Sequence, residues 1–139
     1  MTAVPDRTHS TETLTLLHAD DLESWHWRVR QILQVRPDWK LVATCCDGEE
    51  AVQKAIQLRP NVVILDIGMP GLNGIEAARL IRQKSPLSRI IFLTQQGDPD
   101  FREAALTIPG TRFVLKGNAA TELVPAIAGA IADKNRPPI

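Results

Sequence analysis

The chain repeats one pattern five times: a short apolar run, a turn, and then a segment whose apolar residues have helical spacing. Short apolar runs rich in β-branched residues predict strands buried on both faces, and apolar residues three and four positions apart predict helices with one buried side. The strands are expected at residues 13–19, 40–46, 62–65, 89–93 and 111–115, and the last helix is expected from about 119 to 132.

The apolar positions also predict which side of each helix faces the sheet. The helices end at or before prolines, at Pro37, Pro60 and Pro86, because the residue before a proline disfavours helical geometry. The expected inner faces are Leu22, Trp25, Val29, Ile32 and Leu33 in the first helix; Val52, Ala55 and Ile56 in the second; Ile75, Ala78 and Ile81 in the third; Phe101, Ala104, Ala105 and Ile108 in the fourth; and Leu123, Ile127 and Ile131 in the fifth.

Strict alternation of strands and helices predicts an α/β fold with one parallel sheet covered by helices on both faces. Five strands are too few for an eight-stranded barrel, so we expect a doubly wound, flavodoxin-like sheet with strand order 2-1-3-4-5. In such a sheet the ligand crevice lies at the carboxyl ends of the strands. Residues 13–132 are expected to form this one domain, between a flexible tail at 1–12 and a linker or frayed end at 133–139.

Composition excludes some classes of function. Sixteen basic and sixteen acidic residues leave no net charge, which argues against nucleic acid as the main partner. No apolar run approaches the roughly 20 residues of a membrane span, and the polar residues 1–13 lack the apolar core of a signal peptide. Cys45 and Cys46 are adjacent, which suits neither an unstrained disulfide nor a metal site. We therefore expect a cytoplasmic protein.

Polar residues stand where four of the five strands end. Asp20 and Asp21 follow the first strand and Asp66 the third, while Thr94 follows the fourth and Lys116 the fifth. Any one of them could be a helix cap or a solvated surface residue, and Asp66 alone fits either a helix-capping carboxylate or the reactive group of a cleft. As a set at one edge of a parallel sheet they predict a site.

These residue types suit phosphoryl chemistry. Clustered carboxylates repel one another unless a cation neutralises them, and hard oxygen ligands with room for water suit Mg²⁺ (or Mn²⁺). A carboxylate can then act as a nucleophile toward phosphorus and form an acyl phosphate. The ammonium group of Lys116 and the hydroxyl of Thr94 would contact oxygens of the transferring group.

Four motifs together resemble a response-regulator receiver domain of the CheY-like kind. They are Asp20-Asp21, the segment 65–71 (LDIGMPG), Thr94, and the segment 113–116 (FVLK). The segment 66–78 (DIGMPGLNGIEAA) is similar to the NarL/LuxR-type branch. The resemblance runs from about residue 14 to residue 132, and the motifs occur in the family's order.

The resemblance implies a two-component switch. Asp66 would accept a phosphoryl group from a sensor histidine kinase, and Lys116 would pair with the phosphoryl oxygens. Thr94 would bond the new phosphoryl group and Phe113 would turn inward, which changes the face of the fourth helix, fifth strand and fifth helix. The metal ligands would be Asp21, Asp66, the backbone carbonyl of Gly68 and, through water, Asp20.

Some residues depart from the family pattern. Pro109 and Arg112 stand where glycines are common, so the loop entering the fifth strand is expected to be unusual. Gln95 is longer than the small residue of many receivers and would narrow access to Asp66. His18 is expected to be a half-buried histidine with satisfied hydrogen bonds rather than a proton shuttle.

The competing interpretations belong to other classes. A phosphatase of the haloacid-dehalogenase type needs a second acid two residues after its nucleophile, and that position is Gly68. A nucleotide- or flavin-binding protein needs a glycine-rich loop after the first strand, where the acidic pair stands. A stand-alone or degenerate receiver would act as an interaction or dimerisation module.

The resemblance favours the regulatory part of a transcription regulator, with a possible homodimer, no metabolic turnover and no membrane contact. DNA would be bound only through an output domain outside this chain.

Overall fold

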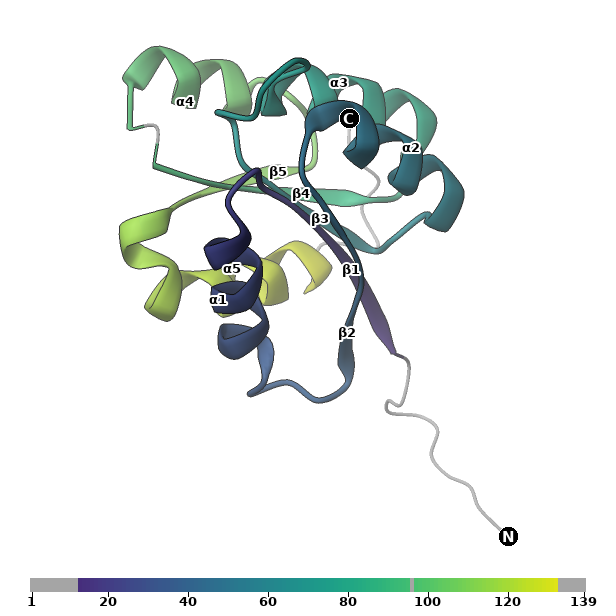
Figure 1. Cartoon of the computed structure of the whole chain (residues 1–139), viewed down its shortest axis with the longest axis vertical. Helices are drawn as coiled ribbons and strands as arrows, with labels where there is room; N and C mark the ends of the chain where they lie inside the picture. The colour runs from purple at the N-terminus through teal and green to yellow at the C-terminus, as the bar shows by residue number, and fades with distance from the viewer. Residues whose placement is uncertain (1–12, 96, 133–139) are drawn as a thin grey trace, which may run out of the picture.

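A computed structural model describes residues 13–95 and 97–132, which form a five-stranded parallel sheet with helices on both faces (Figure 1). The tail expected at 1–12 and the linker expected at 133–139 lie outside the described residues. The strands are β1 (Leu14–Ala19), β2 (Trp39–Cys45), β3 (Val62–Leu65), β4 (Arg89–Thr94) and β5 (Thr111–Leu115). The helices are α1 (Glu23–Leu33), α2 (Gly48–Leu58), α3 (Gly74–Lys84), α4 (Pro99–Leu106) and α5 (Ala119–Ala132), with a short 3₁₀ helix, η2 (Lys116–Asn118), before α5.

The strand order is β2-β1-β3-β4-β5, which confirms the predicted doubly wound sheet. β1 pairs with both β2 and β3, so the chain moves outward from β1 to the β2 edge and then returns past β1 to β3. The carboxyl ends of β1 and β3 are therefore neighbours at the point where the winding reverses. This is the position at which open α/β sheets bind their ligands.

The core has two layers because successive residues of a strand point to opposite faces of the sheet. Leu17 of β1 lies in the layer under α2, α3 and α4, and Leu16 lies in the layer under α1 and α5 (Figure 1). β3 is buried at all four positions, as its continuous apolar sequence predicted. The layers hold the strands rigidly, so the residues that follow each strand begin from fixed positions.

Three residues predicted to face the core are exposed instead. Leu22 is the N-cap of α1 rather than part of its inner face, and Ile56 and Phe101 lie toward the outer sides of α2 and α4. On α1 the buried positions are His26, Val29 and Leu33. Apolar spacing locates a helix but leaves its rotation uncertain by about one residue, because only contact with the sheet decides it.

The loop between β3 and α3 is fixed at its helical end by a capping box. The Asn73 side chain accepts a hydrogen bond from the Glu76 backbone N–H at 3.0 Å, and the Glu76 carboxylate accepts one from the Asn73 N–H at 3.3 Å. The Gly74 N–H donates to the carbonyl of Ile67 at 3.0 Å, and Gly71 has a φ of +68°, which favours glycine. The loop that follows Asp66 is therefore anchored at both ends.

Pro109 lies in the loop that enters β5, and Arg112 is the second residue of that strand. Gly110, with a φ of +75°, supplies a left-handed residue directly after Pro109. The guanidinium of Arg112 lies against α5 at Gly129, where a Cβ atom would be 3.2 Å from its Nη1. A glycine at the neighbouring position thus provides the turn that proline cannot, and the glycine in α5 leaves space for the arginine.

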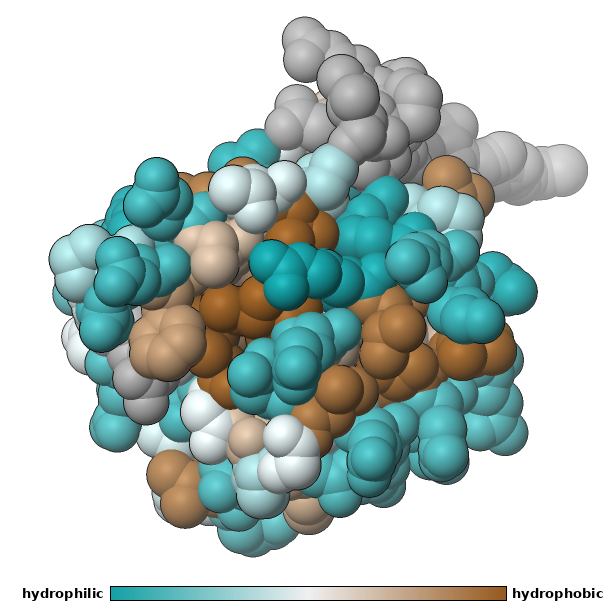
Figure 2. Space-filling model, turned by 90° about the horizontal axis from the view of Figure 1, so that it is seen from above, coloured by the Kyte–Doolittle hydropathy of each residue, from teal (hydrophilic) through white to brown (hydrophobic). Residues whose placement is uncertain are grey.

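The surface over α2, α3 and α4 is mixed in character. Figure 2 looks onto this side from above and shows hydrophobic side chains interspersed with hydrophilic ones. Among the described residues, no helix is long and apolar enough to cross a membrane.

Candidate functional site

The backbone places Asp20 and Asp66 next to each other. The last paired residues of β1 and β3 are Ala19 and Leu65, so the two acids are the next residues on adjacent strands. The Asp66 N–H donates to the carbonyl of Ala19 at 3.0 Å, and the Asp20 N–H donates to that of Cys45 at 2.9 Å. Parallel pairing therefore continues to these residues and brings their side chains to one edge of the sheet.

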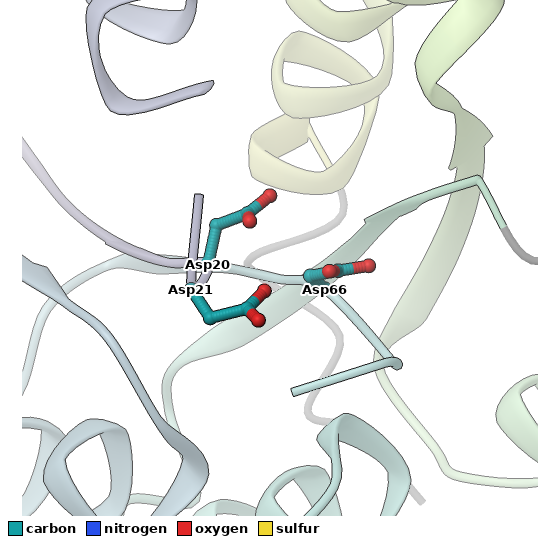
Figure 3. Close-up of side chains that lie close together, drawn as sticks. All are labelled: Asp20, Asp21 and Asp66. Carbon is teal, nitrogen blue, oxygen red and sulfur yellow. The ribbon is translucent and has the colours of Figure 1, made fainter. Parts of the chain in front are cut away.

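Three carboxylates converge at this edge. Each of Asp20, Asp21 and Asp66 offers an oxygen atom within 4.8 Å of the others, and Figure 3 shows all three side chains pointing toward the same region. Asp20 and Asp66 are buried, whereas Asp21 is exposed. The site is thus open to solvent on the side of Asp21.

Lys116 brings one positive charge to the acids. Its Nζ lies 2.7 Å from Asp20 Oδ2 and 3.6 Å from Asp66 Oδ2, and its side chain is only 3% exposed. The other oxygen of Asp20, Oδ1, accepts a hydrogen bond from the Leu22 N–H at 2.9 Å. Because water is excluded, the ammonium interacts more strongly with both carboxylates than it would at the surface.

Burial raises the pKa of the Asp20 carboxyl above its ordinary value. The ammonium of Lys116 and the Leu22 N–H act in the opposite direction, and the charge of Asp66 adds to the rise. A raised pKa means that the ionised carboxylate is disfavoured in the folded protein. The ammonium of Lys116 therefore does not fully compensate the burial of the Asp20 carboxylate, and an added cation would be favoured there.

The other predicted site residues lie around this edge. Thr94 is the last residue of β4, pairs with Leu115 on β5, and is buried. Gly68 is an exposed residue of the loop that follows Asp66, and Gln95 is exposed directly after β4. Phe113 is half-buried, with its ring 6.5 Å from that of Phe92 and 5.1 Å from the Arg102 guanidinium carbon.

The sequence analysis did not predict a pair of buried histidines that lies next to the backbone carbonyl of Asp20. His26 of α1 lies with its Nε2 2.8 Å from the carbonyl of Asp20 and its Nδ1 2.9 Å from Nδ1 of His18. Because the carbonyl can only accept, His26 Nε2–H donates to it, and His18 Nδ1–H then donates to His26 Nδ1. The prediction of a half-buried, fully satisfied His18 is wrong: both rings are buried, and His18 Nε2 has no partner among the described residues.

Because His18 is buried in this pair, we expect the folded protein to lose stability as the pH falls. Burial, followed by the neighbouring His26, Lys116 and Arg30, lowers the pKa of His18 well below its ordinary value of 6.5. Below pH 6.5 the His18 side chain is protonated in the unfolded chain but stays neutral in the folded protein. The contribution of neutral His18 to the free energy of unfolding is therefore complete above pH 6.5 and declines below it. At pH 5.5 we expect a loss of up to about 1.4 kcal/mol from this one group, measured by urea unfolding at several pH values.

His18→Asn is the matched control for this prediction. The asparagine amide can donate to His26 Nδ1 as the imidazole does, but it does not titrate in this range. The raised pKa of Asp20 changes stability with pH in the opposite direction and is common to both proteins, so the difference between their stability curves isolates His18. Parallel stability curves for the two proteins between pH 7.5 and 5.5 would contradict the prediction.

Comparison with known proteins relates this arrangement to one family. The sequence model of the response regulator receiver domain matches residues 16–128. The chain is 38% identical over 122 residues to a protein-glutamate methylesterase/protein-glutamine glutaminase of Thermotoga maritima, covering 86% of this chain and 32% of that protein. It is 30% identical over 121 residues to the nitrate/nitrite response regulator NarL of Escherichia coli K12, covering 87% of this chain and 56% of NarL.

The fold agrees with these relatives. A two-component response regulator of the LuxR family from Aurantimonas sp. SI85-9A1 superposes with a TM-score of 0.81 at 31% identity, over 86% of each chain. The chain spans about a third of the methylesterase and about half of NarL. The part of this chain that matches these relatives is therefore the five-stranded unit.

Proposed function

Because the chain belongs to the response-regulator receiver domain family, we propose that it is a phosphorylation-controlled switch in which Asp66 accepts a phosphoryl group from a sensor histidine kinase. One observation carries the proposal: three carboxylates offer oxygen atoms within 4.8 Å of one another, and a buried ammonium lies beside two of them. Receiver domains are signalling domains, and on this proposal the site carries out only its own phosphorylation and dephosphorylation.

The acidic edge fits a divalent cation. Asp20, Asp21 and Asp66 supply hard oxygen ligands, and the raised pKa of buried Asp20 indicates that its negative charge lacks full compensation. Asp21, Asp66 and the Gly68 carbonyl would hold Mg²⁺ directly, with Asp20 bonded through water. The bound ion would neutralise charge on the acids and on the phosphoryl oxygens.

The side chains of Asp66 and Lys116 would carry out the phosphoryl transfer itself. A carboxylate oxygen of Asp66 forms a bond to phosphorus, and the bond from phosphorus to the histidine nitrogen breaks with its electron pair left on the imidazole. The ammonium of Lys116, 3.6 Å from Asp66 Oδ2, is near enough to pair with a phosphoryl oxygen. The product is an acyl phosphate on Asp66.

The signal would leave the site through β4 and β5. A new dianion on Asp66 attracts the hydroxyl of Thr94, at the end of the adjacent strand β4. Movement of Thr94 would open space for the half-buried ring of Phe113, which now lies against Arg102 of α4. The face formed by α4, β5 and α5 would then change its packing between two states.

The output would come from a further domain. The chain spans only part of its curated relatives, and its segment 66–78 has the NarL/LuxR-type sequence. On this proposal residues 13–132 are the receiver part of a DNA-binding transcription regulator. DNA contact would belong to that second domain.

Incubation with acetyl phosphate tests the proposal. The chain with Mg²⁺ is expected to gain the mass of one phosphoryl group in intact-mass analysis, and prior addition of a chelator is expected to prevent the gain. The donor's P–O bond breaks and acetate leaves with the electron pair, so no kinase is needed. The absence of any adduct with acetyl phosphate, phosphoramidate or carbamoyl phosphate would instead support an interaction module, and continuous phosphate release from many esters would support a phosphatase.

A further inference from the structure

Trp25, which belongs to none of the motifs described above, contacts the ammonium group of Lys116. It lies in the first turn of α1, and Lys116 Nζ is 4.9 Å from the centroid of its ring. A cation within about 6 Å of an indole ring is attracted by the negative face of the ring. Trp25 therefore interacts with Lys116 through more than apolar contact.

The surroundings of Lys116 make this contact strong. The ammonium has Asp20 Oδ2 at 2.7 Å, Asp66 Oδ2 at 3.6 Å and the Trp25 ring as its identified partners, and the side chain is 3% exposed. A cation–π contact gains strength when water is excluded. Arg28 also lies near the same ring, with its Cζ 5.6 Å from the centroid, but Arg28 is exposed and its charge is therefore better screened.

Trp25 itself is held in place. It is half-buried and packs against the core layer that contains Val29 and Leu123. Its backbone N–H donates to the carbonyl of Leu22 at 3.0 Å, and the next residue, His26, binds the carbonyl of Asp20. The first turn of α1 is thus fixed to the acidic edge, and this places the ring beside the ammonium.

We propose that Trp25 is a positioning residue that holds Lys116 beside Asp66 through its ring face and so speeds phosphoryl uptake. Lysine has a long, flexible side chain, and a pairing of Asp20 with a divalent cation would weaken the ion pair that now holds the ammonium. The ring remains as a contact that the cation does not compete for. This inference rests on the proposed function, because the rate it affects is that of phosphoryl transfer to Asp66.

Three variants distinguish an effect of the aromatic ring face of Trp25 from an effect of its apolar packing. Trp25→Leu keeps an apolar side chain without a π face, and Trp25→Phe keeps a smaller π face. Trp27→Leu removes the same residue type from the same helix at a position that is 61% exposed. The rate constant for uptake from acetyl phosphate is measured for each by intact mass at saturating Mg²⁺, with urea unfolding to show that each variant is folded.

We expect Trp25→Leu to react about tenfold more slowly than the wild type, since a desolvated cation–π contact is of that size. Trp25→Phe should recover part of the loss, and Trp27→Leu should match the wild type. NMR provides a readout independent of the reaction: the ε-methylene protons of Lys116 are expected to show an upfield ring-current shift that is reduced in Trp25→Phe and absent in Trp25→Leu.

Equal rates in Trp25→Leu and the wild type would overturn the proposal, as would a Phe variant no faster than the Leu variant. An unshifted ε-methylene signal in the wild type would also overturn it. If the wild type takes up no phosphoryl group at all, the proposed function fails, and that failure is visible before any variant is compared.

Discussion

Asp66→Asn is expected to take up no phosphoryl group from any small donor, although it keeps the fold. The amide nitrogen and oxygen of asparagine are poor nucleophiles toward phosphorus. The neighbouring carboxylate of Asp20 does not replace Asp66 as the nucleophile, because its Oδ2 already pairs with the ammonium of Lys116 at 2.7 Å. The measurement is intact mass after incubation with acetyl phosphate and Mg²⁺. The expected result is complete loss of the adduct.

Asp38→Asn is the matched control for this loss. Asp38 is an exposed aspartate just before β2, at the opposite edge of the sheet, and it pairs only weakly with Arg36 at 3.6 Å. The same substitution there should leave the adduct unchanged. Full adduct formation in Asp66→Asn would assign the phosphoryl group to another residue, and peptide mapping would then locate it.

Gly74→Ala is expected to destabilise the protein by about 3 kcal/mol, the upper end of the range for overpacking. A Cβ atom at Gly74 would overlap the backbone carbonyl oxygen of Asp66 and lie 2.7 Å from the Cα of Ile67. These are backbone atoms of the anchored loop, so they cannot move aside as the end of a flexible side chain would. The free energy of unfolding in urea measures the effect.

The same substitution should also slow phosphoryl uptake, because the clash pushes directly on the residue that accepts the group. Gly117→Ala is the control: a Cβ there meets nothing within 4 Å, and its stability should change by less than about 0.5 kcal/mol. A Gly74→Ala protein as stable as Gly117→Ala would show that the loop after Asp66 can shift at little cost.

Much of the fold could be predicted because its signals are local. β3 is a continuous run of buried apolar residues bounded by turn formers, and the expected strand 62–65 matches its observed bounds, Val62–Leu65. The alternation of strands and helices then limited the topology to a doubly wound sheet, because parallel strands require crossover connections of one hand. Helix rotation was less certain: Leu22 and Ile56 fit an apolar stripe but are exposed.

The membership of the site was predictable for the same reason. Residues that follow parallel strands lie at one edge of the sheet, so Asp20, Asp66 and Lys116 could be grouped from their positions alone. Their roles as phosphoryl acceptor, metal ligand and phosphoryl partner stay predictions. The buried pair of His18 and His26 was missed, although His26 stands three and seven residues before Val29 and Leu33 and so shares their buried side.

The sequence by itself determined the order of the elements, the strand bounds to within one residue and the residue types at the acidic edge, since hydrophobic period and turn chemistry depend on near neighbours in the chain. Only the tertiary structure decided which oxygen of Asp20 meets Lys116, which ring of α1 covers that ammonium, and which histidine binds the carbonyl behind it. These contacts join residues up to about a hundred positions apart. Their geometry depends on how each helix is rotated and seated against the sheet, which no local pattern specifies.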